Sequence, residues 1–172
     1  FIYGGDTMGK EVWVIAFLII FMLHNLEEII MVEKWANKTY PKVKNKIPAF
    51  VEKEIVGITT KRFAIVVFVL SIIVSALILV SVMTNHEYLF LGVNLSFALN
   101  IFTHPLQSLY LRKYTPGVVT SVVLVIPYYI LFFFHFYQTE LLSFHSIMWA
   151  TVVILALVPA FLLSHKLGKK WG

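Results

Sequence analysis

The sequence LHNLEE at residues 23–28 places one imidazole and two carboxylates inside an apolar run that extends from Val12 to Val32. About 20 predominantly apolar residues are enough for a helix to cross the hydrocarbon core of a bilayer. Ionisable side chains are costly at that depth, so they need partners and usually mark a functional site. The stretch therefore predicts a membrane-spanning helix that carries a buried polar site.

The composition of the whole chain agrees with a membrane protein. Of its 172 residues, 59% are hydrophobic and 13% are charged, and the mean hydropathy is +0.84. A soluble domain carries about 25% charged residues. The sequence has no cysteine, which excludes disulfides, thiolate metal ligands and a cysteine nucleophile. Histidines and carboxylates are therefore the candidate groups for chemistry.

Apolar runs of membrane-spanning length recur along the chain. We expect an all-α membrane protein, a bundle of five transmembrane helices at about residues 11–32, 63–83, 88–111, 117–137 and 144–164. Residues 11–165 would form one transmembrane domain. Residues 1–10 are predicted to be an N-terminal extension that need not be native, and residues 166–172 a basic tail. A short interfacial helix is predicted at residues 47–56, with Pro48 in its first turn.

The basic residues are distributed unevenly over the connections. Thirteen of the 14 Lys and Arg residues lie between spans one and two, between spans three and four, or in the tail, and only Lys10 lies on the other side. Under the positive-inside rule the N-terminus is outside and the C-terminus is cytoplasmic, with a basic cytoplasmic segment at residues 33–62. We expect a multi-pass protein of the cell membrane whose cations meet anionic headgroups, with no nucleic acid as a partner.

The three ionisable residues of the opening stretch share one helix face. At about 100° per residue, His24, Glu27 and Glu28 fall within an arc of about 100°. Such a group can bind a divalent metal, with Zn the first expectation and Fe or Mn the alternatives. It can also act as an acid–base pair without metal. A third interpretation is a buried polar cluster that holds helices together.

A second polar stripe lies on the third span. Asn100, His104, Gln107 and Ser108 follow the spacing of one helix face. Spans one and three run in the same direction, and at about 1.5 Å per residue His24 and His104 reach similar depths in the cytoplasmic half of the bilayer. We therefore expect His104 to join the first cluster as a metal ligand, with Asn100 beside it. The alternative is that these side chains only form hydrogen bonds between helices.

The connection after the third span carries two adjacent cations. Arg112 and Lys113 precede Thr115 and Pro116, which are typical of a helix start. Cations beside free backbone N–H groups predict a site for an anionic headgroup. We expect Arg112 and Tyr114, together with Asn100, to contact the substrate. The alternative is a basic loop that only sets the topology.

These motifs resemble a known family. The pattern HxxEE at residues 24–28 is the one that names the HXXEE family of small membrane proteins. The later NxxxH at residues 100–104 and RxYxPGxxT at residues 112–120 are also similar to that family's pattern, and the resemblance spans about residues 11–165. The family is described mainly without an assigned function, so the resemblance supports the choice of site residues and implies no reaction. A weaker likeness in architecture is to the emopamil-binding sterol isomerases, which place His and Glu inside a helical bundle.

Together these observations predict a metal-dependent membrane enzyme, hydrolase-like or transferase-like, that acts on a lipid or another amphiphile. His24 and His104 would hold the metal with one or both of Glu27 and Glu28. Glu27 and Glu28 are the candidate catalytic residues, because a carboxylate not occupied by metal would serve as general base. Two alternatives stay open: a metal-independent acid–base isomerase of emopamil-binding type, and a non-enzymatic small-molecule carrier or binding protein.

The topology can be tested by labelling in intact cells. Because residues 33–62 are predicted to be cytoplasmic, a Lys44→Cys variant should stay unlabelled by a membrane-impermeant thiol reagent. The absence of native cysteine removes any background, and Lys10→Cys on the predicted outer side is the control that should be labelled. Labelling at residue 44 in intact cells would contradict the predicted orientation.

Overall fold

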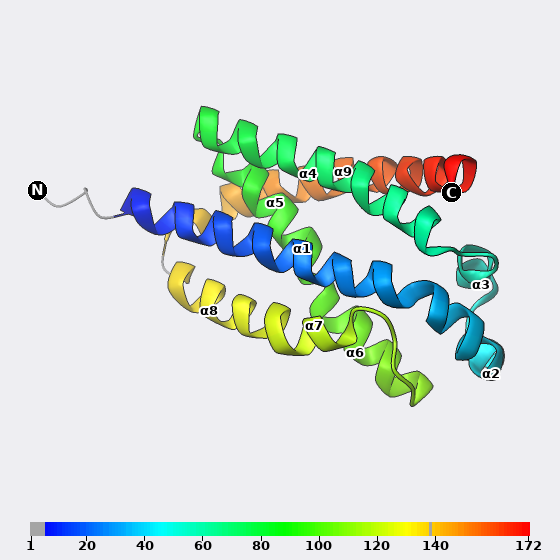
Figure 1. The fold of residues 1–172 in the computed structure, drawn as a ribbon. Helices are drawn as coiled ribbons and strands as arrows, with labels where there is room; N and C mark the ends of the chain where they lie inside the picture. Colours follow the sequence, from blue (N-terminus) through cyan, green and yellow to red (C-terminus); the bar gives the residue numbers. More distant parts are fainter. Residues whose placement is uncertain (1–5, 138) are drawn as a thin grey trace, which may run out of the picture.

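A computed structural model of the chain describes residues 6–137 and 139–172, and every regular element in those residues is a helix (Figure 1). In chain order the elements are α1 Asp6–Lys38, α2 Tyr40–Val43, the 3-10 helix η1 Lys44–Lys46, α3 Ala49–Ile55, α4 Thr60–Thr84, α5 Glu87–Ala98, α6 Asn100–Leu111, α7 Val118–Thr120, the π-helix η2 Ser121–Val125, α8 Ile126–Phe136, the 3-10 helix η3 Glu140–Leu142, and α9 Phe144–Trp171.

Five helical segments within the described residues are long and apolar enough to cross a membrane. Their outer surfaces carry large apolar side chains such as Met83, Phe134 and Phe144, which are 74%, 85% and 85% exposed. Soluble monomers rarely expose large contiguous apolar areas, whereas lipid tails cover them without cost. The prediction of an all-helical, multi-pass membrane protein with five spans is therefore confirmed in its coarse form.

Helix α1 begins at the opposite end of the bundle from the C-terminus (Figure 1), as an odd number of crossings requires. The short helices α2 and α3 lie at the same end as the C-terminus (Figure 1). Helix α3 corresponds to the helix predicted at residues 47–56 and begins directly after Pro48. Its Glu54 carboxylate pairs with Arg62 at the start of α4, at 3.0 Å, and with Lys169 near the end of α9. Which end faces the cytoplasm stays a prediction from the charges.

The helices extend beyond the apolar runs from which they were predicted. Helix α1 begins at Asp6, inside the predicted extension 1–10, and α9 continues to Trp171 through the predicted tail 166–172. The hydropathy of the sequence identifies only the apolar part of a helix. Residues such as Lys and Glu have high helix propensity, so the backbone hydrogen bonds continue beyond the apolar run. The long helices therefore project past the hydrocarbon region.

Hydroxyl side chains fix where two of the long helices begin. The Thr59 hydroxyl accepts a hydrogen bond from the Arg62 backbone N–H at 3.0 Å, which caps α4. The Ser143 hydroxyl accepts from the Ser146 N–H in the same way at the start of α9. Helix α4 ends at Thr84. The next residue, Asn85, has a φ of +56°, the left-handed conformation that commonly follows the last turn of a helix.

The third span is interrupted, which differs from the continuous helix predicted, whereas the irregular turn of the fourth span lies where Pro127 predicts a kink. The third divides at Leu99 into α5 and α6. The fourth begins at Val118, after Gly117 and not at the predicted Thr115–Pro116 start, and widens into the π-helix η2 just before Pro127. Proline lacks a backbone N–H and crowds the preceding turn, so one irregular turn at this position is expected.

The buried core is built mainly from residues of α5 and α8, with further residues from α1, α4 and α9, and α9 makes its contacts with α4 and α5. Gly92 of α5 marks the closest approach to α9. A Cβ atom added at Gly92 would lie 2.6 Å from Cβ of Val153 and 2.9 Å from the carbonyl oxygen of Ala150. Small residues allow helix backbones to approach closely in membrane proteins, and Gly92 has this role between α5 and α9.

Gly92→Ala should therefore destabilise the protein. Inserting a methyl group into this contact should lower the free energy of unfolding by about 1–3 kcal/mol, the usual cost of overpacking, measured by thermal unfolding in detergent. Gly9→Ala is the matched control, because a Cβ atom there would meet nothing within 4 Å. An unchanged melting temperature for Gly92→Ala would contradict the close packing of α5 on α9.

Candidate metal site

Three ionisable side chains from two helices converge in the interior. His24 and Glu28 lie one turn apart on α1, and His104 lies on α6. Nε2 of His104 is 3.3 Å from one Glu28 carboxylate oxygen, and Nε2 of His24 is 3.9 Å from the other. The two imidazole rings meet edge-on, with centroids 5.0 Å apart. The sequence-based pairing of the first and third spans at the depth of His24 and His104 agrees with this geometry.

The group can hold a metal ion. One potential ligand atom from each of His24, Glu28 and His104 lies within 4.8 Å of the other two. Two ligands of one zinc ion, each about 2.0–2.2 Å from it, are at most about 4.4 Å apart, so small side-chain rotations would close the set. Two imidazoles with one carboxylate are the ligands of several catalytic zinc sites and of non-haem iron sites, which both keep a coordination position open.

Two buried imidazole nitrogens in this group lack a hydrogen-bond partner within the described part of the chain. They are Nε2 of His24, whose side chain is 1% exposed, and Nδ1 of His104. Buried polar atoms in folded proteins are almost always paired, so an unpaired one calls for a ligand or an ordered water. Each of these two buried nitrogens can therefore still donate or accept a hydrogen bond inside the protein.

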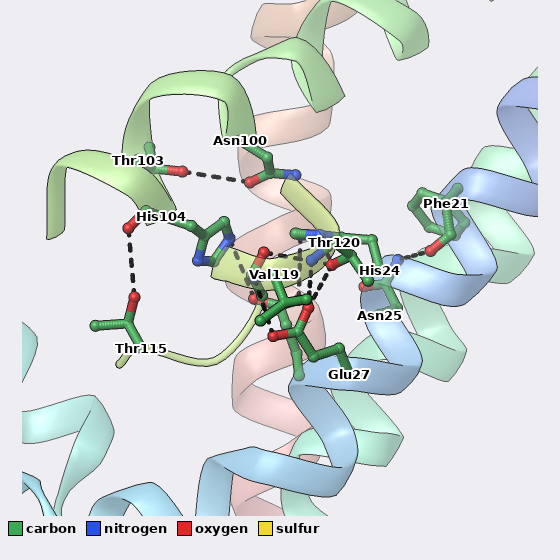
Figure 2. A network of polar contacts seen from close by, with 12 residues as sticks. Phe21, His24, Asn25, Glu27, Asn100, Thr103, His104, Thr115, Val119 and Thr120 are labelled. Atoms are coloured by element: carbon green, nitrogen blue, oxygen red, sulfur yellow. Dashed lines mark hydrogen bonds and ion pairs between the residues drawn. The ribbon is translucent and has the colours of Figure 1, made fainter. Parts of the chain in front are cut away.

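Glu27 lies beside the group and makes a separate set of contacts (Figure 2). One carboxylate oxygen accepts hydrogen bonds from the Thr120 backbone N–H at 2.7 Å and from the Thr120 hydroxyl at 2.6 Å. The other accepts from the Tyr114 hydroxyl at 2.7 Å and from the Val119 N–H at 3.3 Å. Of the two carboxylates predicted as ligands, the structure brings Glu28 into the metal-binding group and directs Glu27 to the segment that precedes η2.

The Thr120 hydroxyl connects Glu27 with His24. It lies 2.9 Å from Nδ1 of His24 while its hydrogen points to the Glu27 carboxylate, so it accepts the hydrogen bond from the imidazole. This pattern assigns the proton of neutral His24 to Nδ1 and leaves the Nε2 lone pair free. Metal-binding histidines are usually oriented in this way, by a hydrogen bond from the nitrogen that does not bind metal. The unpaired Nε2 is then the ligand atom.

Gly117 closes the site from the α6–α7 connection. Its φ of +85° is in the left-handed region that side chains rarely adopt. A Cβ atom there would lie 3.0 Å from Cε1 of both His24 and His104. Glycine is therefore required both by the backbone conformation and by the two imidazoles that the backbone covers.

Comparison with known proteins identifies the family. A family model described as "Protein of unknown function with HXXEE motif" matches residues 15–132, more than half of the chain. The chain belongs to the HXXEE family. It is also similar to the "Uncharacterized protein YrkK" of Bacillus subtilis (strain 168), at 26% identity over 159 residues, which covers 86% of this chain and 90% of that protein. No solved structure matches the chain.

Within the HXXEE motif the three ionisable positions therefore differ in their surroundings. His24 and Glu28 face His104, whereas Glu27 faces Thr120 and Tyr114. A helical wheel places all three residues on one face. It does not show that Glu27 and Glu28, which lie about 100° apart, contact different neighbours.

The other predicted site residues lie around the cluster. Asn100 is on α6 one turn before His104, and its amide oxygen accepts the Thr103 hydroxyl at 3.4 Å (Figure 2). Arg112 is exposed at the end of α6. The Tyr114 hydroxyl donates to Glu27, and burial together with the Glu27 carboxylate raises the pKa of Tyr114, so the phenol stays a donor. Contact of these three residues with a substrate stays a prediction.

Three residues with a role at the site were not assigned one from the sequence. Thr120 and Gly117 were noted only as part of a family pattern, and Trp35 was not noted. The Trp35 indole donates to the Tyr114 carbonyl at 2.6 Å and fixes the connection against α1. Thr120 and Ser121 are the polar residues in the otherwise apolar stretch 118–126, which was a possible signal for Thr120, but nothing local in the sequence relates it to His24.

Thr120→Val should destabilise the protein by about 1–3 kcal/mol, because it leaves a carboxylate and an imidazole without their shared hydroxyl partner. Thermal unfolding in detergent measures the loss. Thr120→Ser, which keeps the hydroxyl, should retain most of the stability. Thr151→Val is the control for the same change at a hydroxyl that only bonds a carbonyl of its own helix, at 2.9 Å. Equal effects of the Val changes at 120 and 151 would contradict the bridging role.

Proposed function

We propose that this HXXEE-family protein is a metal-dependent enzyme of the cell membrane that acts on a lipid or another amphiphilic substrate. The divalent ion would be held by His24, Glu28 and His104. The observation that carries the proposal is the unpaired Nε2 of buried His24, oriented through Thr120 toward a second imidazole and a carboxylate. Zinc suits the ligand set best, and iron or manganese is the alternative.

Each residue has a distinct role in this proposal. A divalent ion with an open coordination position supplies Lewis-acid polarisation of a substrate oxygen. Glu28 supplies the carboxylate ligand, since its oxygens form ion pairs only with the imidazoles of His24 and His104 within the described chain. Glu27 takes a positioning role, because four hydrogen bonds hold its carboxylate to Tyr114, Val119 and Thr120.

A metal-independent acid–base mechanism is the second candidate. The observation that favours it is the distance of 3.3 Å between Nε2 of His104 and the Glu28 carboxylate, which suits direct proton exchange between the two groups. An isomerase would need this pair and no ion. The metal content of the protein separates the two mechanisms.

Elemental analysis of the purified full chain tests the metal site. The parent protein should hold about one zinc, iron or manganese ion per chain after growth with all three metals. His104→Ala should lose this ion, because two remaining ligands do not retain it against a mild chelator. Thr120→Val should keep all three ligands and bind with about 10–100-fold lower affinity.

His145→Ala is the matched control, since this exposed histidine lies at the start of α9, outside the cluster. Circular dichroism should show unchanged helix content in each variant. Full retention of metal by His104→Ala would contradict the ligand set. A metal-replete preparation that holds no ion would overturn the metal mechanism and favour the acid–base alternative.

A further inference from the structure

A groove lies on the surface beside the metal site. It has a volume of about 520 Å³ and runs along the end of α6, the connection after it and the start of the fourth span. Pro105, Leu109, Val118 and Val122 form its apolar walls, and Arg112, Lys113 and Tyr114 line its polar part. The groove is shallow and largely open to the outside, as a site for a headgroup at the membrane surface would be. One groove thus combines an apolar wall with a cationic rim.

The two cations of the groove have no carboxylate partner. Arg112 and Lys113 are exposed, and neither forms an ion pair with any residue in the described part of the chain. By contrast, Arg62 and Lys169 share the carboxylate of Glu54, and Lys10 pairs with Glu87. The cationic rim of the groove is therefore available to an external anion.

The surface around the groove is suited to lipid. Leu109 is 74% exposed, and Val122 on the other wall is 51% exposed. Arg112 occupies a left-handed conformation, with φ of +53°, where glycine would be less strained. The chain thus presents a guanidinium at a position whose backbone conformation favours glycine, beside side chains that face the membrane.

The groove adjoins the proposed catalytic residues through one side chain. Tyr114 lines the groove and donates its hydroxyl to Glu27 at 2.7 Å. Glu27 in turn accepts the hydroxyl of Thr120, which contacts His24. A molecule bound in the groove would therefore lie next to the metal-binding group, at the side from which a membrane amphiphile can enter.

We propose that this groove binds the anionic headgroup of a membrane lipid, with Arg112 and Lys113 on its phosphate or carboxylate and its chain along Leu109 and Val122. The inference rests on the proposed function, because it names the class of amphiphile on which the metal site acts. A planar guanidinium with a neighbouring ammonium suits an oxyanion headgroup, and the apolar wall excludes a ligand that is polar throughout.

Native mass spectrometry of the delipidated full chain in detergent tests the proposal. With phosphatidylglycerol and phosphatidylcholine as probes, the parent should retain phosphatidylglycerol at least about tenfold more tightly. The double variant Arg112→Gln/Lys113→Gln should remove most of this preference, because each cation near a membrane surface raises the affinity for an anionic lipid about fivefold. Arg112→Gly removes one cation and relieves the left-handed backbone, so it should lower the preference while its melting temperature stays close to that of the parent.

Lys44→Gln/Lys46→Gln is the matched control, because it removes two exposed cations of η1 that lie outside the groove. It should leave the preference unchanged. An equal loss in this control would assign the preference to diffuse charge and overturn the groove. Displacement of the lipid by millimolar inorganic phosphate would show a site for soluble anions, which also overturns a lipid site.

Metal content measured on the same samples separates this inference from the proposed function. Arg112→Gly should lose lipid preference and keep its metal, whereas His104→Ala should lose metal and keep its lipid preference. A metal-loaded protein without headgroup preference would overturn the groove alone. A protein that selects phosphatidylglycerol but never holds metal would overturn the metal mechanism alone.

Discussion

The Thr120 hydroxyl, shared between the Glu27 carboxylate and the His24 imidazole, is the contact on which the arrangement of the site depends. It joins the first span to the start of the fourth and sets which nitrogen of His24 carries the proton. An isolated carboxylate at this depth would be costly, and four hydrogen bonds from the fourth span and the preceding loop offset that cost. The same contacts leave Nε2 of His24 free toward Glu28 and His104.

The irregular parts of the backbone are concentrated around this contact. The third span breaks at Leu99, just before the helix that carries His104, and Gly117 turns the chain over both imidazoles. The π-helix η2 begins at Ser121, directly after Thr120. Regular transmembrane helices would satisfy their own backbone groups and present only side chains. Val119 and Thr120 lie in the first turn of the fourth span, where a helix leaves its backbone N–H groups unpaired, and these two groups bind Glu27.

The bundle itself is uneven in its packing. Helices α4, α5 and α9 make most of the contacts between helices, with Gly92 allowing contact at Val153. The segment from α6 to η2 packs against fewer neighbours, so the site lies at the less densely packed side of the bundle.

The sequence by itself determined the class of the protein and most of its site. Apolar runs of about 20 residues can be stable only as membrane helices, so the five spans follow from hydropathy. Helical spacing placed His24 and His104 on the polar faces of their spans. The rise per residue gave both the same expected depth in the bilayer, so the sequence predicted that the two side chains meet. The tertiary structure alone decided which glutamate faces the imidazoles, where the helices break, and that Thr120 and Trp35 organise the site. These features depend on contacts between residues about 80–100 positions apart, which local periodicity does not encode.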